Sequence, residues 1–415
     1  MEPKIRYNGY TNKWDDVCLN DIVSTAGIKN RENLPLVSFS ITNDQGFVPQ
    51  DDKFENGGTM RDANKSMYYI VSPKTFAYNP ARINVGSIGY YDLEKDVIIS
   101  SLYVVFKTDQ EKCDDYYFLQ WFKSDKFKRL IEQYQEGGVR LYFFYDKLCK
   151  CHVHIPSKEE QHKISSYFRV LDFKLQASAK KLESLKKLKS ASLVAMFPQQ
   201  GKTTPKVRFK GFEGEWKKVK FLEIFEFLKN NSLSRAELSS KGDFINIHYG
   251  DILIKYGDLV NIQNEELTYI RDCRIGQTLY KMCSLQNGDI IIADAAEDYS
   301  VGKCSEIVNI GNNKVVSGLH TIPCRPLITF AQGYLGHYIN SNSYHNQLLP
   351  LIQGSKISSI SKKTLSQTSV FVPSYEEQQA IATFFRSLDR KIALETARLE
   401  KLKQIKLACL DKMFV

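Results

Sequence analysis

The sequence of 415 residues contains no long uninterrupted apolar run. Nowhere do about eighteen apolar residues follow one another, which excludes an ordinary membrane-spanning helix. The start, Met1-Glu2-Pro3-Lys4, also lacks the basic segment and apolar stretch of a cleaved secretion signal. Nine cysteines are scattered from Cys18 to Cys409 without a pairing rhythm, as expected of free thiols in a reducing compartment. We therefore expect a cytoplasmic protein.

Recognisable catalytic motifs are also missing. An adenine methyltransferase needs an Asn-Pro-Pro-aromatic loop, but Asn79-Pro80-Ala81-Arg82 lacks the second proline and the aromatic residue, so we expect only a turn at a strand end. Gly201-Lys202-Thr203 ends like a phosphate-binding loop, yet Met196 stands where that loop requires its first glycine. The sequence predicts no catalytic residue.

One group of residues has the composition of a zinc site. It consists of Cys149, Cys151, His152 and His154. If these residues lie in a strand, the two cysteines face one side and the two histidines the other, so a single tetrahedral site is disfavoured. We expect this chain to bind no metal and no cofactor.

Length, composition and charge narrow the class of protein. A chain of 415 residues exceeds the size of one hydrophobic core, so two or more domains are expected. With 43% hydrophobic and 25% charged residues, the composition is typical of a soluble globular protein. Lysine and arginine number 57 against 47 acidic residues, a net charge of +10. This charge favours a polyanionic partner, although a basic protein without one has the same charge.

Two blocks of sequence recur in the same order. Pro3-Lys4-Ile5-Arg6-Tyr7, followed by Trp14, returns 202 residues later as Pro205-Lys206-Val207-Arg208-Phe209, followed by Trp216. Ile155-Pro156-Ser157 returns 217 residues later as Val372-Pro373-Ser374, and this offset holds to the end, where Met413-Phe414 repeats Met196-Phe197. The chain is therefore a tandem duplication. Its second globular part carries 15 extra residues net, in the first half of that part.

A long helix is predicted at the end of each module. Ser157 with Glu160, and Ser374 with Glu377, have the spacing of capping boxes. Residues 158–196 contain no proline or glycine and as a helix would span roughly 58 Å. This length favours pairing with the equal helix of the other module over packing on one domain. The apolar stripe is Ile164, Phe168, Leu171, Leu175, Leu182, Leu185, Leu188 and Met196 in the first helix, and Ile381, Phe385, Leu388, Ile392, Leu399, Leu402, Ile405 and Met413 in the second.

The connection between the modules suggests how the two helices pair. A short linker, residues 198–204, leads directly from the first helix into the next globular part. Helices that leave equivalent domains in this way can pair antiparallel. The predicted fold is α+β, a pseudo-twofold tandem repeat of two β-rich domains separated by a long antiparallel two-helix coiled coil. The expected boundaries are 1–154 for the first domain, 155–197 for its helix, 205–371 for the second domain and 372–415 for its helix.

Both globular parts contain short runs of β-branched and aromatic residues. One amphipathic helix is expected in each, near residues 116–135 and 334–352. The predicted strands are residues 36–39, 68–71 and 102–105 in the first part, and residues 244–247 and 289–292 in the second.

Side chains able to contact DNA are interleaved with aromatic residues in both parts. Arg, Asn, Gln and Lys can reach base edges, and scattered Lys and Arg can meet phosphates. Any single such residue is more often solvated surface, but the set in duplicated domains favours binding. The candidates are Arg61, Lys65, Tyr69, Arg82, Asn84 and Arg140 in the first domain, and His248, Tyr249, Lys255, Arg271, His320 and Lys356 in the second.

The borders and helices resemble one known family, the specificity subunits of type I restriction-modification systems. The resemblance is carried by Pro205-Lys206-Val207-Arg208-Phe209, by Gly211-Phe212-Glu213-Gly214-Glu215-Trp216, and by Glu377-Gln378, Phe384-Phe385 and Leu388-Asp389 in the second helix. It covers essentially the whole chain. The resemblance implies two target-recognition domains, each reading one half of a split DNA sequence, and two spacer helices that set the gap.

The resemblance also implies partners. These are double-stranded DNA, two adenine-methyltransferase (modification) subunits held near the helices, and restriction subunits with a motor and a nuclease. S-adenosylmethionine, ATP and Mg²⁺ are then expected on the partner subunits, and this chain is expected to be non-catalytic. A structural adaptor that binds proteins but no DNA remains the alternative from the residues alone. Salt-dependent duplex binding separates the two.

Overall fold

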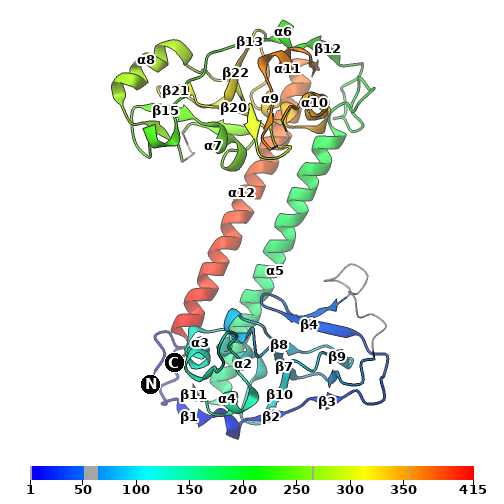
Figure 1. Ribbon diagram of the computed structural model, residues 1–415, viewed down its shortest axis with the longest axis vertical. Helices are drawn as coiled ribbons and strands as arrows, with labels where there is room; N and C mark the ends of the chain where they lie inside the picture. Colours follow the sequence, from blue (N-terminus) through cyan, green and yellow to red (C-terminus); the bar gives the residue numbers. More distant parts are fainter. Residues whose placement is uncertain (1, 51–63, 264–265, 355) are drawn as a thin grey trace. The chain divides into compact units, whose positions relative to one another are not determined.

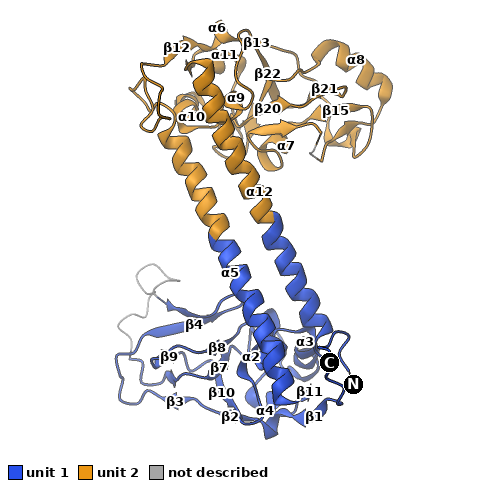
Figure 2. Cartoon of the chain, turned by 180° about the vertical axis from the view of Figure 1, so that it is seen from behind, with its two compact units in different colours: residues 1–180, 397–415 blue, residues 181–396 orange. Residues whose placement is uncertain are grey.

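The computed structural model describes residues 2–50, 64–263, 266–354 and 356–415. The chain forms two compact units, coloured separately in Figure 2. Unit 1 contains residues 1–180 and 397–415, and unit 2 contains residues 181–396. Each unit therefore combines one globular part with portions of both long helices. In the described part of the chain, no helix is long and apolar enough to cross a membrane.

A pair of border strands closes each globular part. In unit 1, β1 (Asp15–Cys18) runs antiparallel to β11 (His152–Ile155), with Asp15 opposite Ile155. In unit 2, β12 (Lys217–Lys220) runs antiparallel to β24 (Ser369–Val372), with Lys217 opposite Val372. Lys217 lies 202 residues after Asp15, and Val372 lies 217 residues after Ile155. The offset of 202 residues thus relates the first strands of the two ladders, and the offset of 217 residues relates their second strands.

Unit 1 contains two further sheets around an aromatic core. Its four-stranded sheet has the order β2-β10-β7-β8, and its five-stranded sheet the order β3-β6-β9-β4-β5. Phe76, Phe106, Phe118 and Trp121 are among the buried rings between sheet and helices. The strands are β2 Val23–Thr25, β3 Ile28–Lys29, β4 Ser38–Thr42, β5 Gly46–Pro49, β6 Tyr69–Val71, β7 Thr75–Tyr78, β8 Ile88–Tyr91, β9 Val97–Ile99 and β10 Val104–Thr108.

Unit 2 repeats this plan with different strands. Its five-stranded sheet has the order β13-β22-β18-β20-β16, its four-stranded sheet the order β14-β17-β15-β21, and β19 pairs with β23. The strands are β13 Phe225–Phe227, β14 Leu238–Ser239, β15 Phe244–Ile247, β16 Leu259–Asn261, β17 Tyr269–Ile270, β18 Ile290–Ala293, β19 Ala295–Ala296, β20 Cys304–Val308, β21 Lys314–Ser317, β22 Thr321–Pro326 and β23 Ser358–Ser359.

The segments that follow β4 and β15 fold differently in the two units. In unit 1, β4 pairs in parallel with β9 and antiparallel with β5, and residues 43–45 join β4 to β5. In unit 2, β15 pairs in parallel with β21 and antiparallel with β17, and residues 248–268 join β15 to β17. This longer connection contains α7 (Tyr249–Ile254) and β16. Helix α7 and strand β16 thus stand where unit 1 has β5, and the extra residues of the second module lie mainly after the next strand, where residues 72–74 join β6 to β7 but residues 271–289 join β17 to β18.

The prediction of a single amphipathic helix in each globular part is wrong for both parts. Residues 116–135 form two helices, α2 (Asp115–Trp121) and α3 (Asp125–Tyr134), and residues 334–352 form α9 (Tyr334–Ile339), α10 (Asn342–Leu348) and the 3-10 turn η5 (Leu349–Leu351). Ser124 and Ser341 sit at the breaks, where each hydroxyl donates to a carbonyl three residues earlier. Serine competes with the helix for backbone partners, and apolar periodicity alone does not reveal such a break.

Shorter helices complete the units. Unit 1 also has α4 (Tyr145–Cys149), η1 (Leu19–Asp21) and η3 (Ile83–Val85). Unit 2 also has α6 (Phe221–Ile224), α8 (Cys273–Cys283), α11 (Lys362–Ser366) and η4 (Arg235–Glu237).

The long helices are α5 (Lys158–Ala195) and α12 (Tyr375–Lys412). As predicted, the Ser157 hydroxyl accepts from the Glu160 amide and the Ser374 hydroxyl from the Glu377 amide. The second half of each capping box is wrong. The Glu160 carboxylate instead accepts two hydrogen bonds from Arg6, both 2.8 Å long, and the Glu377 carboxylate accepts two from Arg208, at 2.6 and 2.7 Å.

The two helices pair antiparallel within each unit, in agreement with the predicted fold class (Figure 1). In unit 1, Phe168 of α5 stacks on Phe414 and Asp172 pairs with Lys406 of α12. In unit 2, Phe385 of α12 stacks on Phe197, and Asp389 pairs with Lys189 of α5. Each of these contacts in unit 2 corresponds to a contact in unit 1 whose residues lie 217 positions away in sequence. The pseudo-twofold repeat therefore extends to individual side-chain pairs.

The end of each helix completes the core of the opposite module. Leu410, Met413 and Phe414 are buried in the core that contains Trp14 and Tyr117 of the first globular part. Met196 and Phe197 are buried in the core of the second. The first globular part is thus built around the last residues of the chain.

Most of the predicted stripe faces inward. Leu171, Leu182 and Leu388 are buried, while Leu175, Leu185, Ile392, Leu399 and Leu402 are partly buried. Leu188 is a correction, because half of its surface is exposed. Next to it, Lys189 turns inward between two carboxylates. A straight helix drifts relative to a seven-residue repeat, so a leucine can leave the seam over this length.

Candidate nucleic-acid interface

Lys65 and Tyr69 both lie on the five-stranded sheet of unit 1, Lys65 over β4 and Tyr69 on β6. The Lys65 ammonium donates to the Ser38 hydroxyl at 2.8 Å. The Tyr69 ring, partly buried on β6, lies beneath the Lys29 ammonium, which is 3.7 Å from the ring centre. A tyrosine face and two ammonium groups are suited to an anionic, stacked ligand. Arg61, predicted for the same region, lies outside the described residues.

Arg82 and Asn84 follow β7 on an exposed turn. As predicted, Asn79 begins this turn: its side-chain oxygen accepts from the Ala81 amide, and its carbonyl accepts from the Arg82 amide. Arg82 and Asn84 are both exposed. Arg140 is also exposed, on the segment between α3 and α4. The five candidates of the first domain that the structure describes therefore do not form one cluster.

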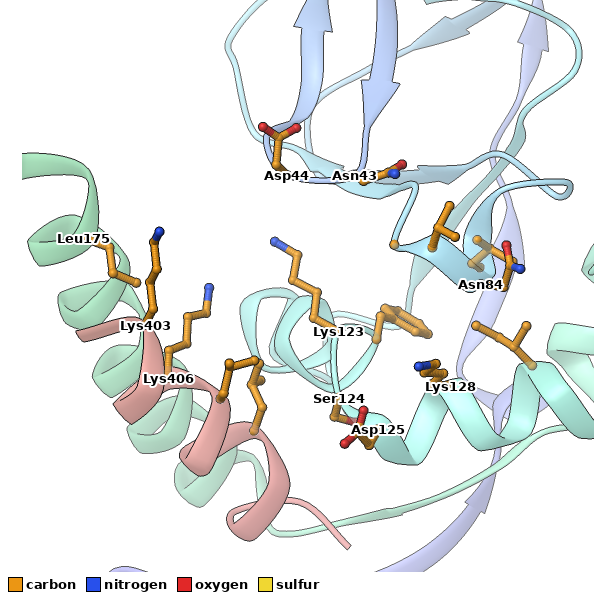
Figure 3. A pocket seen from close by; sticks show the side chains of 17 residues that line it. Asn43, Asp44, Asn84, Lys123, Ser124, Asp125, Lys128, Leu175, Lys403 and Lys406 are labelled. Atoms are coloured by element: carbon orange, nitrogen blue, oxygen red, sulfur yellow. The ribbon is translucent and has the colours of Figure 1, made fainter. Parts of the chain in front are cut away.

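A basic cleft of about 810 Å³ lies beside Asn84 in unit 1. Its walls are the turn after β4, η3, the junction of α2 and α3, and the neighbouring faces of α5 and α12. Figure 3 shows Lys123, Lys403 and Lys406 extending into the same space near Asn43 and Asp44. Its charged lining is four lysines against two aspartates: Lys123, Lys128, Lys403 and Lys406, with Asp44 and Asp125.

Lys123 differs from Lys406 in that no partner in the described ranges balances its charge. Lys406 forms an ion pair with Asp172, whereas Lys123 makes no hydrogen bond or ion pair with any residue that the structure describes. Its side chain keeps contact with solvent because the cleft is open, yet protein surrounds it at longer range. Burial first, and then the charge of Lys406, lower the pKa of Lys123 to about 8. An anion in the cleft would relieve both effects.

The equivalent place in unit 2 has the opposite chemistry. Lys189, which corresponds to Lys406, lies 2.6 Å from Asp258 and 2.5 Å from Asp389, and the Nε2 of His337 lies 2.9 Å from the Asp389 carboxylate, which accepts the hydrogen bond. Burial alone would raise the pKa of Asp389, but the hydrogen bond with His337 and the charge of Lys189 lower it. Two carboxylates of unit 2 therefore balance the charge of Lys189.

The same residues are the one group in the described part of the chain with the ligand spacing of a metal site. Ligand atoms of Asp258, His337 and Asp389 lie within 4.8 Å of one another. The Lys189 ammonium already contacts both carboxylates, so the positive charge that a metal would supply is present. These residues fit a buried ion-pair network better than a metal site.

Three candidates of the second domain converge around α7. The Tyr249 ring lies 4.7 Å from the His248 ring and 5.1 Å from the His320 ring, measured between ring centres. His320 is exposed and pairs with Asp294 at 3.1 Å. Nearby, Arg235 makes two hydrogen bonds with Asp251 at 2.9 and 2.7 Å. This surface is polar, aromatic and held by ion pairs.

His248 corrects the expectation of a direct DNA contact. Only 4% of its surface is exposed, and its Nδ1 accepts from the Gly250 amide at the start of α7. Burial, and then the nearby Arg235, lower the pKa of His248 to about 4, so the ring is neutral at pH 7. His248 is a helix cap that positions Tyr249.

The remaining candidates of this domain lie apart. Lys255 is exposed and lines a groove of about 470 Å³ with Arg235 and Tyr269. Arg271 is exposed, and its guanidinium donates to the Leu238 carbonyl at 3.2 Å. Lys356 is exposed in the segment before β23. The sequence identifies these residues as candidates, but it does not show which of them lie together in the structure.

The strand assumed for the cysteine and histidine group is also corrected. Cys149 ends α4, Cys151 is buried after it, and β11 begins only at His152. The argument from alternating strand faces therefore does not apply to the cysteines. His152 instead pairs with Asp16 across the border ladder, at 3.2 Å.

Comparisons with known proteins point to one family. The model of the family described as "Type I restriction modification DNA specificity domain" matches residues 12–187 and again residues 213–404. A comparison with curated proteins gives no match. Among solved structures, the type I restriction-modification S subunit from M. genitalium is similar, with a TM-score of 0.58 and 16% identity over 100% of this chain and 99% of that one.

A second solved structure has the same extent of similarity. It is described as "Structural basis underlying complex assembly and conformational transition of the type I R-M system", with a TM-score of 0.53 and 15% identity over 97% of this chain and 98% of that one. At these identities the likeness concerns the fold.

Proposed function

This chain belongs to the family of type I restriction-modification DNA specificity domains, and we propose that each of its globular parts reads one half of a bipartite, asymmetric DNA sequence. The observation that supports the proposal is that the two modules share their border strands and long helices but differ in the segments between them. The border ladders and helix contacts repeat residue for residue, whereas a strand, β5, follows β4 and a helix, α7, follows β15. Two different readings on one scaffold require this combination.

The unit 1 cleft supports a sequence-independent contribution to binding. Lys123, Lys403 and Lys406 converge in a space wide enough for a phosphate group, next to the exposed Asn84. Phosphate contacts release counterions, so affinity should fall steeply with salt. In this proposal the cleft holds the sugar-phosphate backbone, and the exposed Arg82 and His320, with the partly buried Tyr249, lie nearer to bases.

The chain itself is proposed to be non-catalytic. Methyl transfer would then belong to two modification subunits, which carry S-adenosylmethionine, and cleavage to restriction subunits, which use ATP and Mg²⁺. A duplicated chain offers equivalent exposed positions to two copies of one partner, such as Glu159 with Glu376 and Arg169 with Arg386. Reversing both arginines to glutamate should prevent assembly of two modification subunits, and reversing one should leave one bound, as measured by native mass spectrometry.

The experiment that tests the function maps methylated adenines in DNA modified by the assembled complex. We expect one split, asymmetric sequence, and duplex binding that weakens steeply with salt. Replacing residues 205–371 with the matching part of a relative should change one half of the sequence only. Assembly without salt-dependent DNA binding would favour a structural adaptor, and methyl transfer by the purified chain alone would contradict the non-catalytic role.

The helices are proposed to set the gap between the half-sites. Because the pairing is antiparallel, a matched insertion must lie between residues 180 and 181 of α5 and between residues 396 and 397 of α12. One heptad in each helix keeps the apolar stripes in register and adds about 10 Å, roughly three base pairs. Two residues in each would rotate the stripes by about 200° and prevent assembly. An unchanged gap in an active heptad variant would contradict this role.

A further inference from the structure

Helix α8 is a two-faced element at the edge of unit 2, on the side away from α5 and α12 (Figure 1). Its inner face covers the four-stranded sheet through Gly276, Leu279, Tyr280 and Cys283. Gly276 permits a close approach, because a Cβ atom there would lie 2.5 Å from the Phe244 ring. The helix is therefore fixed on the sheet by one complete face.

The outer face is lined by four polar side chains. Arg274, Gln277, Thr278 and Lys281 have the spacing i, i+3, i+4, i+7 of one helical face, and all four are exposed. Helix α8 contains no Asp or Glu, unlike α3 of unit 1, which mixes Asp125 and Glu132 with its basic residues. An ordinary solvated face alternates charges of both signs, so this composition indicates an anionic partner.

The chemistry of the four residues matches the edges of base pairs. An arginine can make two hydrogen bonds to guanine, and a glutamine can make two to adenine. The Thr278 hydroxyl already donates to the Arg274 carbonyl at 3.0 Å, so its methyl group is the part that can contact a thymine methyl group. Lysine can reach a flanking phosphate. Ile275 and Met282 are also exposed on this side, by 42% and 54%, and offer apolar contact to thymine methyl groups.

The helix also fits the groove in size and is firmly held. Eleven residues span roughly 16 Å, and the major groove of B-form DNA, about 12 Å wide, admits one helix. The Asp272 carboxylate accepts from the amides of Arg274 and Ile275 at 2.7 and 3.3 Å. The Arg274 guanidinium itself makes no hydrogen bond or ion pair with any residue of the described ranges. The Arg274 guanidinium is therefore available to a ligand, while the backbone that carries it is held in place.

We propose that α8 is the recognition helix of the second module and enters the DNA major groove with Arg274, Gln277, Thr278 and Lys281. This inference rests on the proposed function of the chain as a DNA-specificity subunit. It assigns base reading to Arg274 and Gln277 and backbone contact to Lys281. It applies to one half-site only, the half read by the second module.

The test uses the complex assembled with the modification subunits of its own system. Methylation is measured on a library in which both half-sites are randomised. Arg274→Ala and Gln277→Ala should each lower discrimination at one or two positions of a single half-site by roughly 5- to 100-fold, and leave the other half-site unchanged. Arg274→Lys should restore affinity but not discrimination, because it keeps the charge and loses the bidentate geometry.

Two controls keep the result decisive. Arg129→Ala removes an exposed arginine from α3 of unit 1 and should change neither half-site. Gly276→Ala keeps every polar side chain but pushes α8 away from Phe244, and should relax the same half-site as Arg274→Ala, whereas Gly257→Ala, in open space, should not.

The outcomes separate the two levels of the proposal. Unchanged discrimination in Arg274→Ala and Gln277→Ala complexes of wild-type stability would overturn the role of α8 while leaving the specificity function intact. A wild-type complex without any sequence preference would overturn the specificity function itself.

Discussion

The two units share their frame and differ in what the frame carries. Arg6 with Glu160 in unit 1 corresponds to Arg208 with Glu377 in unit 2, and the Phe168–Phe414 stack corresponds to the Phe385–Phe197 stack. Beside these contacts, the basic cleft of unit 1 is replaced in unit 2 by a lysine enclosed by carboxylates. Contacts that hold the scaffold have stayed alike, while surfaces open to a ligand have diverged.

The comparison also shows that neither globular part is complete without a distant segment. Each core is closed by the end of the helix that belongs to the other module. Stability of one reading domain therefore depends on residues far away in sequence.

Removing the ring at the end of either helix should destabilise the opposite module. Phe414 is 2% exposed against Tyr117 and Phe168, and Phe197 is fully buried against Tyr338 and Phe385. Phe414→Ala and Phe197→Ala should each cost about 3–5 kcal/mol, measured by denaturant unfolding.

Hydrogen exchange locates the effect. Phe414→Ala should speed exchange in α2 and Phe197→Ala in α9, whereas Leu407→Ala, at an exposed position, should change little. Faster exchange confined to residues 205–371 after Phe414→Ala would contradict the conclusion that the end of α12 completes the core of the first module.

Breaking the repeated ion pair should have equal effects in both units. Arg6→Ala leaves the Glu160 carboxylate, 1% exposed, without its partner, and Arg208→Ala does the same to Glu377. We expect a loss of about 3 kcal/mol in each case, measured by thermal unfolding. Lys112→Ala removes an exposed pair with Asp109 and should cost less than about 1 kcal/mol. A large loss at only one of the two arginines would show that the pairs are not equivalent.

Acid should weaken unit 2 through a histidine without a counterpart in unit 1. The pKa of His248 is about 4 in the folded chain and about 6.5 when unfolded. The unfolded chain therefore gains a proton first as pH falls, and about 2–3 kcal/mol of stability should be lost between pH 6.5 and pH 4.

The measurement compares unfolding of the wild type and His248→Asn at pH 7 and at pH 4.5. The stability difference should shrink on acidification, because His248→Asn removes the group that takes up a proton on unfolding. A constant difference for His248→Asn would exclude this source of acid sensitivity.

The smallest effect concerns the cleft of unit 1. Lys123→Ala should make the dependence of log affinity on log salt concentration shallower by about 0.9, without loss of fold stability. Because the pKa of Lys123 is about 8, wild-type affinity should also fall as pH rises above 8, and the variant should lose less. Lys112→Ala serves as the charge-matched control. An identical salt slope for wild type and Lys123→Ala would place the DNA backbone elsewhere.

Much of the scaffold follows from the sequence by itself. The two offsets locate the border strands, the absence of proline and glycine locates the long helices, and Ser157 and Ser374 mark where they begin. These features are local or strictly repeated, so periodicity and helix-start signals suffice to find them. The missing half of the capping boxes could also have been suspected, because Arg6 and Arg208 recur together with Glu160 and Glu377.

The surfaces for a ligand were decided only by the tertiary structure. Lys123, Lys403 and Lys406 each look like an ordinary helix-surface lysine, and they meet only because the end of α12 packs beside α3. His248 looks like a DNA contact in the sequence but is buried as a helix cap. Helix α8 hides its apolar face against strands from three different segments. Periodicity reports which face of an element is apolar, whereas charge clusters and exposure depend on contacts between residues far apart in sequence.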